Sequence, residues 1–322
     1  MLNAFLRQLH KPETAPRRLI IRDMPHREAA CIAAELNPPF AILGAHHQTT
    51  PFIFNSPHSG RTYPSVLLEA SRLSPQALRK SEDSFVEELF SGTVWQGAVL
   101  MHALFPRAYL DINREPYELD PVLFKGTLPP YANSQSLRAM GGLGTIARIV
   151  NEREEIYKRP LAVEAGLVRI EHLYKPYHAA LARQIEATRE RFGVAFLIDC
   201  HSMPSQDADR GGPWCDFVLG DRFGTSCAPE VTHAVESLLK GLGYKVALNK
   251  PYAGGFITEH YGRPDRGIHA LQIEIDRSLY MNEVTFSRLP SFQSVQRDLA
   301  RLTLMMTSDL PVLAGGYRTA AE

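Results

Sequence analysis

The stretch VAFLIDCHS, residues 194–202, decides the fold class of this 322-residue chain. Its first five residues are apolar and Asp199 follows them, which predicts a strand buried on both faces that ends in a polar turn. Similar apolar runs recur on either side of it. The sequence predicts strands at 52–55, 99–104, 108–112, 194–199, 216–219, 245–248 and 270–275.

Helical patterns separate these apolar runs. The predicted helices cover 74–90, 144–192 with a break near Lys175-Pro176, 231–242 and 295–306. The last two repeat apolar residues every three or four positions, as a helix with one buried face does. Strands that alternate with helices predict an α/β fold with a mostly parallel mixed sheet and helices on both faces.

The proline pair Pro38-Pro39 divides the chain into two parts. Residues 1–38 show no clear alternation of strand and helix patterns, and we expect them to form an N-terminal extension. Residues 39–322 carry the alternating pattern and are expected to form a single α/β catalytic domain. A chain of this length buries enough surface to fold without covalent cross-links.

Charge and cysteine content limit the possible partners. The 35 Lys and Arg balance 35 Asp and Glu, so no broad charged surface is available for nucleic acid or an anionic membrane. No segment reaches the roughly 20 apolar residues that span a bilayer, and the N-terminus lacks the apolar core of a signal peptide. The four cysteines form no CxxC pair and are expected to be reduced, in a cytoplasmic protein.

Two histidines follow predicted strands directly. His58 lies in the segment NSPHSGR, residues 55–61, and His201 lies in DCHSMPS, residues 199–205. Because parallel strands end at one edge of a sheet, the two side chains can converge there, and neutral imidazole is the commonest metal ligand. The alternative is that each histidine caps a strand end and hydrogen-bonds the backbone. Two matched contexts favour the metal-ligand interpretation.

A catalytic zinc site needs a third protein ligand, often a carboxylate. The spacing of residues does not identify it. The acidic candidates lie on the predicted helix after the first histidine: Glu82, Asp83, Glu87 and Glu88. The alternative for each of them is a solvent-exposed helix face.

A third polar cluster brackets the apolar run 108–112. Alternation along a strand would place Arg107, Asp111 and Asn113 on one face, with Arg114 just beyond. Charges beside a buried strand are costly unless they are paired, so an Asp–Arg pair is one explanation. A guanidinium group directed at a substrate carboxylate is the other, and both remain open.

Glu274 interrupts the apolar strand 270–275. Burial would raise the pKa of this carboxyl into the range that suits a general acid or base. The alternative is a solvent-facing glutamate on an edge strand. Other catalytic motifs are missing from the sequence: it contains no GxxxxGK[ST], GxSxG or HExxH motif, and no GxGxxG follows a strand.

Seven short motifs in a fixed order resemble the N-formylglutamate amidohydrolase family between about residues 52 and 283. They are SPHSGRTYP, Asp83 with VEELF after it, RAYLDINREP, KPYHAAL, DCHSMPS, GGFIT with YG after it, and ALQIEIDRSLYMNE. The resemblance implies a three-layer fold similar to that of zinc carboxypeptidases. It also implies hydrolysis of N-formyl-L-glutamate to formate and L-glutamate in histidine degradation. His58 and His201 would then be zinc ligands and Glu274 the catalytic carboxylate.

Two positions depart from the patterns of these enzymes. Zinc carboxypeptidases have His-x-x-Glu, but the third residue after His58 is Arg61. The carboxylate ligand must therefore come from elsewhere, and Asp83, which matches a family aspartate, is the first choice and Glu82 the second. Family members tend to have a basic residue after GGFIT, where this chain has Glu259. An acidic residue there would repel a glutamate side chain if it touched the substrate.

We therefore expect an enzyme that uses one zinc ion, bound by His58, Asp83 and His201, to cleave the amide of an N-acylated amino acid. Glu274 would transfer the proton, and Arg114 or Arg107 would stabilise the oxyanion or hold a substrate carboxylate. The residues expected to bind the substrate are Arg107, Asn113, Arg61, Ser59 and Tyr261. The alternatives are an amidase or carboxypeptidase for another N-acyl amino acid or peptide, and a metal-binding protein without turnover.

Overall fold

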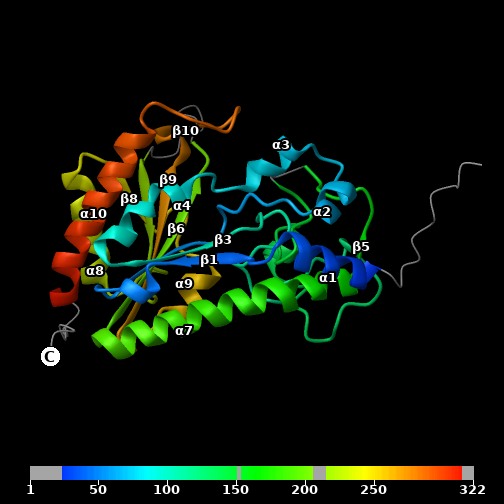
Figure 1. Cartoon of the computed structure of the whole chain (residues 1–322), viewed down its shortest axis with the longest axis horizontal. Helices are drawn as coiled ribbons and strands as arrows, with labels where there is room; N and C mark the ends of the chain where they lie inside the picture. The colour runs from blue at the N-terminus through cyan, green and yellow to red at the C-terminus, as the bar shows by residue number, and fades with distance from the viewer. Residues whose placement is uncertain (1–23, 151–153, 206–214, 314–322) are drawn as a thin grey trace, which may run out of the picture.

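A computed structural model describes residues 24–150, 154–205 and 215–313, and its centre is a seven-stranded mixed sheet (Figure 1). The strand order is β1-β3-β2-β6-β9-β7-β8. Four of the six neighbouring pairs are parallel, while β1 with β3 and β7 with β9 are antiparallel. The strands are β1 Phe40–Leu43, β2 Phe52–Ser56, β3 Val99–Ala103, β6 Ala195–Met203, β7 Phe217–Gly220, β8 Val246–Leu248 and β9 Ile268–Asp276.

Helices cover both faces of this sheet and complete the three layers. Helices α7 (Lys175–Phe192) and α9 (Phe256–Tyr261) pack in one hydrophobic cluster with α1 (Met24–Glu35) and α6 (Val163–Arg169). On the other face lie α4 (Val86–Leu89), α8 (Pro229–Gly241) and α10 (Phe292–Leu313). The predicted α/β class with a mostly parallel sheet is confirmed.

Alternate residues of the central strands supply the two cores. In β2, Ile53 belongs to the α7 side while Phe52 and Phe54 belong to the α10 side. In β6, Leu197 and Phe196 divide in the same way, and the rings of Phe52 and Phe196 stack with centroids 4.7 Å apart. Both faces of these strands are apolar because both are covered, which explains the unbroken apolar runs in the sequence.

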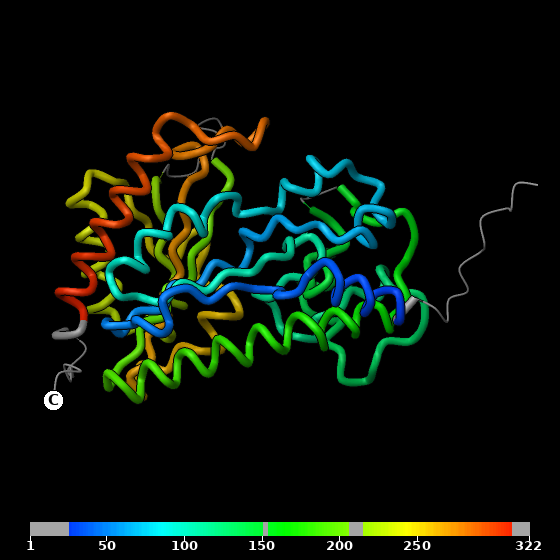
Figure 2. Tube along the Cα trace, viewed as in Figure 1, coloured from blue at the N-terminus to red at the C-terminus, as the bar shows by residue number. Residues whose placement is uncertain are grey.

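The expected N-terminal extension contains a helix that belongs to the core. Helix α1 (Met24–Glu35) lies beside the beginning of α6 (Val163–Arg169), as Figure 2 shows. Cys31 and Ile32 are buried in the cluster on this face of the sheet. Residues 24–35 are therefore helical, contrary to the expectation of no regular pattern. Residues 1–23 lie outside the described residues, and the domain boundary at residue 38 stays a prediction.

The helix predicted at 74–90 is two short helices, α3 (Pro75–Leu78) and α4, linked by the 3-10 turn η3 (Arg79–Ser81) and a bend. Phe85, at the start of α4, has a φ of 69°, which no helix interior allows. The interruption turns Asp83 toward the sheet edge, where its backbone N–H donates to the carbonyl oxygen of His58 at 3.1 Å. A tertiary contact has overridden the helical spacing of the apolar residues.

Two further predicted elements differ in the structure. Residues 108–112 form turns rather than a strand, and the N–H of Asp111 donates to the carbonyl oxygen of Thr145 at 2.8 Å. The helical stretch predicted from 144 begins only at α6. It then passes through a π-helix, Ile170–Tyr174, into α7 without a break at Pro176, because the wider π turn accommodates a residue that has no N–H.

No helix within the described ranges combines the length and apolar character needed to cross a bilayer. The four cysteines Cys31, Cys200, Cys215 and Cys227 are buried and unpaired.

Candidate active site and metal centre

The carboxyl ends of three neighbouring parallel strands bring the predicted site residues together. Strands β2, β6 and β9 lie side by side, so they end at one edge of the sheet. His58 follows β2, as predicted. His201 was expected in a turn after Asp199, but it lies inside β6, because pairing with β9 extends this strand to Met203. Glu274 lies near the end of β9. Asp83 reaches the same edge from the bend before α4. Four segments that are distant in sequence thus meet at one point.

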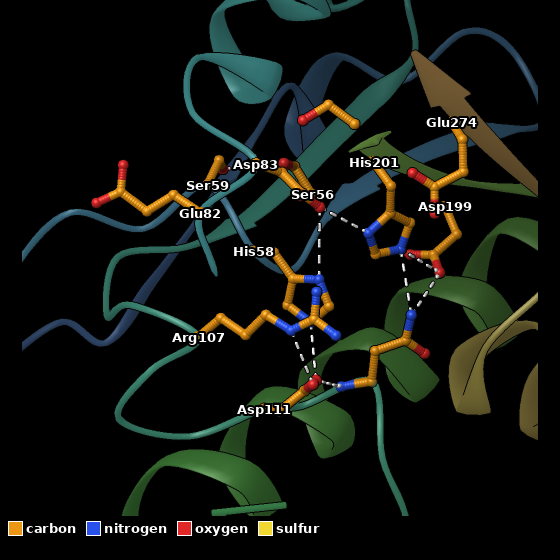
Figure 3. A network of polar contacts seen from close by, with 12 residues as sticks. Ser56, His58, Ser59, Glu82, Asp83, Arg107, Asp111, Asp199, His201 and Glu274 are labelled. Atoms are coloured by element: carbon orange, nitrogen blue, oxygen red, sulfur yellow. Dashed lines mark hydrogen bonds and ion pairs between the residues drawn. The ribbon is translucent and has the colours of Figure 1, made fainter. Parts of the chain in front are cut away.

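His58, Asp83 and His201 form a buried group that could hold a metal ion. One ligand atom from each residue lies within 4.8 Å of the others. The Nδ1 atoms of both histidines face Oδ2 of Asp83, at 3.5 Å for His58 and 2.9 Å for His201. Figure 3 shows the two rings next to each other, with centroids 4.9 Å apart. Two imidazoles and a carboxylate are a ligand set that zinc commonly binds.

Each imidazole ring also contacts a carboxylate of its own through Nε2, on the side of the ring opposite Asp83. Nε2 of His58 lies 2.8 Å from Oδ1 of Asp111, and Nε2 of His201 lies 2.9 Å from Oδ2 of Asp199. A carboxylate in this place holds the Nε2 proton and leaves the Nδ1 lone pair available to a metal. The same arrangement accompanies histidine ligands in zinc enzymes.

The electrostatics of this group also fit a cation. Nδ1 of His58 is buried and has no hydrogen-bond partner in the part of the chain that the structure describes, which is costly for a polar atom. Burial opposes ionisation of Asp83, but the hydrogen bond with His201 and the nearby His58 ring hold the pKa of Asp83 well below its usual range. Burial lowers the pKa of His201, but Asp199 and Asp83 outweigh it and raise that pKa well above its usual value. The surroundings favour positive charge here.

Glu274 is buried beside this group on β9, an interior strand between β6 and β7. Its Oε1 accepts a hydrogen bond from Nε2 of Gln272 at 3.0 Å. Burial is the main reason that the pKa of Glu274 rises to about 7, with attraction to His201 opposing it and repulsion from Asp83 adding to it. A carboxyl with this pKa can both accept and donate a proton near neutral pH. The alternative of a solvent-facing glutamate on an edge strand is wrong.

A cavity of about 490 Å³ adjoins the metal-binding group and Glu274. Arg107 and Arg114 line it. Nε of Arg107 donates to Oδ2 of Asp111 at 2.9 Å, and Nε of Arg114 donates to the carbonyl oxygen of Leu143 at 2.9 Å. An Asp–Arg pair and a guanidinium group directed at the substrate were the two explanations of these charges. They are compatible, since Arg107 pairs with Asp111 and also lines the cavity.

Asn113 lines the same cavity, but its amide group serves contacts within the protein. Oδ1 accepts a hydrogen bond from the N–H of Ile257 at 2.8 Å, and Nδ2 donates to Oδ2 of Asp199 at 3.4 Å. A Cβ at Gly255 would lie 2.5 Å from the Asn113 amide, so only glycine allows this approach. Asn113 thus links the start of α9 to the carboxylate that orients His201.

Three residues expected to bind the substrate do not line the cavity: Arg61, Ser59 and Tyr261. Nη2 of Arg61 donates to two glutamates of α4, each at 2.9 Å. Ser59 accepts a hydrogen bond from Ser56 at 2.9 Å, and the hydroxyl of Tyr261 lies 2.8 Å from Nδ1 of His178. The structure offers no support for direct substrate contact by these side chains.

Glu82, the second choice for the carboxylate ligand, points away from both histidines (Figure 3). Its carboxylate is occupied by Tyr63 at 2.5 Å, Ser84 at 2.6 Å and Arg79 at 3.0 Å. The geometry therefore brings Asp83, and not Glu82, into the group with the histidines.

Glu259 also lies outside the cavity. Its side chain is exposed and pairs with Nη2 of Arg222 at 2.8 Å. The repulsion that an acidic residue at this position would exert on a glutamate side chain is therefore reduced by its pairing with Arg222.

Sequence reasoning missed the role of Arg277. Its Nη2 donates to Oδ1 of Asp83 at 3.1 Å and to the carbonyl oxygen of Glu82 at 2.7 Å, which fixes the carboxylate that faces the histidines. The available signal was a charged residue placed directly after a buried strand. Further cavity-lining residues that the sequence did not single out are Arg138, Tyr252 and Gln272.

Comparison with known proteins agrees with this geometry. The family model of N-formylglutamate amidohydrolase matches residues 50–281. An N-formylglutamate deformylase of Pseudomonas putida is 31% identical over 251 residues, which cover 75% of this chain and 86% of the relative. A second N-formylglutamate deformylase, from Pseudomonas aeruginosa, is 27% identical over 247 residues, with the same coverage of both chains.

Solved structures give the same result. The crystal structure of an N-formylglutamate amidohydrolase from Ralstonia eutropha JMP134 has a TM-score of 0.79 and 38% identity, and covers 84% of this chain and 97% of that one. A structure from Agrobacterium tumefaciens, with a TM-score of 0.61 and 17% identity, shares the fold; the match covers 84% of this chain and 94% of that one. With a matched family model over most of its length and a relative above 30% identity, this chain belongs to the N-formylglutamate amidohydrolase family.

Proposed function

We propose that this protein hydrolyses N-formyl-L-glutamate to formate and L-glutamate. Family membership makes it a hydrolase that acts on an amide bond. The observation that carries the proposal is the buried group of His58, Asp83 and His201 beside Glu274, in a cavity with arginines in its walls. The relatives from two Pseudomonas species, named as N-formylglutamate deformylases, support the choice of substrate.

His58, Asp83 and His201 would hold the metal, which we propose is zinc. The unsatisfied Nδ1 of His58 and the carboxylates behind each imidazole support this ligand set. Zinc bound there supplies a Lewis acid for the acyl carbonyl oxygen and a lower pKa for its bound water. Arg277 would act as a positioning residue, because its hydrogen bond to Oδ1 of Asp83 leaves Oδ2 facing the two histidines.

Glu274 would be the group that moves the proton. It would accept a proton from the water whose oxygen attacks the formyl carbon, and would donate it to the nitrogen as the carbon–nitrogen bond breaks. This transfer needs a carboxyl that is ionised before attack and protonated afterwards, which its raised pKa supports. Glu274 pairs with His201, a proposed metal ligand, and this supports a position close to the bond that would be cleaved.

Arg107 and Arg114 would supply positive charge for the substrate. Arg107 is already held by Asp111, so the position of its guanidinium group is fixed before the substrate binds. Nη1 of Arg114 donates to the carbonyl oxygen of Asn113 at 3.0 Å and its Nε to that of Leu143. Its Nε also lies 3.6 Å from Oδ2 of Asp111, which already accepts from Arg107. Two guanidinium groups thus share one carboxylate, so positive charge would remain for a substrate carboxylate or the oxyanion.

The proposal also covers the setting of the reaction. We infer a small-molecule substrate, a role in histidine degradation and a cytoplasmic location, with no nucleic acid or membrane partner. The balance of 35 basic and 35 acidic residues supports the absence of a nucleic acid partner.

A substrate panel tests this function. The purified protein would be stripped with a chelator, reloaded with zinc and assayed with N-formyl-L-glutamate, N-acetyl-L-glutamate, N-formyl-L-methionine and a short peptide. We expect formate release from N-formyl-L-glutamate with the highest kcat/KM, its loss on chelation and its return with zinc. Faster turnover of another acyl amino acid or of the peptide would replace the substrate, and zinc binding without any turnover would contradict the enzymatic function.

A further inference from the structure

Arg138 is a cavity-lining cation that pairs with no acidic side chain among the residues that the structure describes. It lies on α5, a short helix of residues Leu137–Met140, and its side chain has neither a hydrogen bond nor an ion pair with any described residue. The other arginines of the cavity differ in this respect. Arg107 and Arg114 both pair with Asp111, at 2.9 and 3.6 Å. Arg277 pairs with Asp83 at 3.1 Å. Arg138 is therefore available to an anion that enters the cavity.

The backbone holds Arg138 close to Arg114 through Leu143. The N–H of Leu143 donates to the carbonyl oxygen of Arg138 at 2.8 Å, and the carbonyl oxygen of Leu143 accepts from Nε of Arg114 at 2.9 Å. One residue thus links the two arginines. Their charges also interact: burial is the main cause that lowers the pKa of Arg114 to about 10, and repulsion from Arg107 and Arg138 adds to it.

Hydrogen bonds and packing hold helix α5 in place, although Arg138 itself is exposed. Oγ of Ser136 caps the helix by accepting from the N–H of Ala139 at 2.9 Å, and it also donates to the carboxylate of Glu118. Ala139 is completely buried. A Cβ at Gly144, after the helix, would lie 2.1 Å from the carbonyl oxygen of Glu118, which shows how closely the segment packs. The backbone of Arg138 is therefore held in a fixed position relative to the cavity.

We infer that Arg138 binds the side-chain carboxylate of an acidic N-acyl amino acid and so selects acidic over neutral substrates. The inference rests on the proposed function, in which the acyl group lies at the metal-binding group. An N-acylated acidic amino acid has two carboxylates, and a cavity that binds both needs two cations besides the metal. Arg114, or Arg107, takes one, and Arg138 is the cavity arginine for which the described residues provide no acidic partner.

The test compares N-formyl-L-glutamate with N-formyl-L-glutamine, which has nearly the same shape but a neutral side chain. In the zinc-loaded Arg138→Ala variant, we expect the ratio of the two kcat/KM values to fall by about 10- to 100-fold, the loss typical of one charge-assisted hydrogen bond. Most of the change should lie in KM for the acidic substrate. Arg138→Lys, which keeps the charge but not the bidentate geometry, should lose less of the ratio.

Arg222→Ala is the matched control. Arg222 is also an arginine near the cavity, since a Cβ at the cavity-lining Gly254 would lie 3.1 Å from its side chain, but its charge is paired with Glu259. We expect Arg222→Ala to keep the substrate ratio of the wild type. A fall of the ratio in Arg222→Ala but not in Arg138→Ala would overturn the inference and assign the selection to Arg222.

Two further outcomes separate this inference from the proposed function. If the wild-type enzyme prefers N-formyl-L-glutamate and Arg138→Ala keeps that preference, or loses activity equally on both substrates, Arg138 does not select the side chain. If the zinc-loaded wild type releases formate from neither substrate, the proposed function itself fails. Melting temperatures of all variants would show that Arg138→Ala and Arg138→Lys remain folded.

Discussion

His201 lies directly opposite Glu274 in the parallel register of β6 and β9. Paired residues of neighbouring strands point to the same face of a sheet, so the proposed metal ligand and the proposed proton carrier are held together by backbone hydrogen bonds. A shift of the register by one residue would turn Glu274 to the opposite face. The chemistry of the site thus depends on a pairing that nine residues of each strand secure.

The metal-ligand assignment predicts the behaviour of two histidine variants. His58→Ala and His201→Ala should each lose bound zinc and hydrolysis of N-formyl-L-glutamate, because two protein ligands seldom retain a catalytic zinc. Zinc content by mass spectrometry and formate release measure both effects. His233→Ala, at an exposed position of α8, is the control and should keep both. Full zinc stoichiometry in both site variants would remove these residues from the ligand set.

Glu274→Gln should separate catalysis from metal binding. The amide keeps the size of the side chain but cannot take a proton, so kcat should fall by about 10²- to 10⁴-fold while zinc remains bound. Glu190→Gln, at an exposed position on α7, is the matched control and should keep the wild-type kcat. A kcat close to the wild-type value in Glu274→Gln, with unchanged zinc content, would show that Glu274 has a structural role.

Local sequence patterns predict the sheet and the two histidines because both depend on short segments. The apolar run 52–54 correctly predicts a strand that ends just before His58, but β6 continues past the predicted end at Asp199 to Met203, so His201 lies inside the strand. Only the resemblance to the family indicates Asp83, because the helical spacing around it predicts an exposed helix face. Its position depends on contacts with His58 and Arg277, which are distant in sequence. Such contacts leave no local signal.

The substrate-binding residues were less predictable for the same reason. Arg61 is three residues from His58, but its side chain turns to two glutamates of α4. Arg138 lies in a segment without a strong helix or strand pattern, and it reaches the cavity because α5 is anchored to Glu118. Which arginine faces a cavity is decided by pairing across the fold, and sequence proximity to a ligand is a poor guide.

The carboxylates that face Nε2 of each imidazole are expected to strengthen metal binding, so removing one charge should weaken it in part. Asp111→Asn keeps a side chain of the same size behind Nε2 of His58, but it removes the negative charge that orients the ring and pairs with Arg107. We expect zinc affinity to fall by about 10- to 100-fold, which competition with a chromophoric chelator measures. The same variant saturated with zinc should recover part of its activity. An unchanged zinc affinity would show that Asp111 serves only the arginines.

The last prediction concerns stability at acidic pH and His178 of α7, whose ring contacts Ile112 and Tyr261. Its Nε2 lies 2.8 Å from the carbonyl oxygen of Ile112, and its Nδ1 lies 2.8 Å from the hydroxyl of Tyr261. Burial is the main cause that lowers the pKa of His178 to about 4, with a smaller opposing effect of the bond to Ile112. Neutral His178 can satisfy both partners, one as a donor and one as an acceptor.

Because the pKa of His178 is lower in the folded state than the usual value near 6.5, the unfolded chain binds the proton first as pH falls. The stability from this group is complete above about pH 6.5 and is lost progressively toward pH 4. His178→Gln removes the titration, so it should be less stable than the wild type at pH 7.5, and the difference should shrink by about 1–2 kcal/mol at pH 5. Urea unfolding of chelator-treated protein at both pH values measures the difference without a contribution from zinc release. A difference of the same size at the two pH values would show that His178 does not titrate in this range.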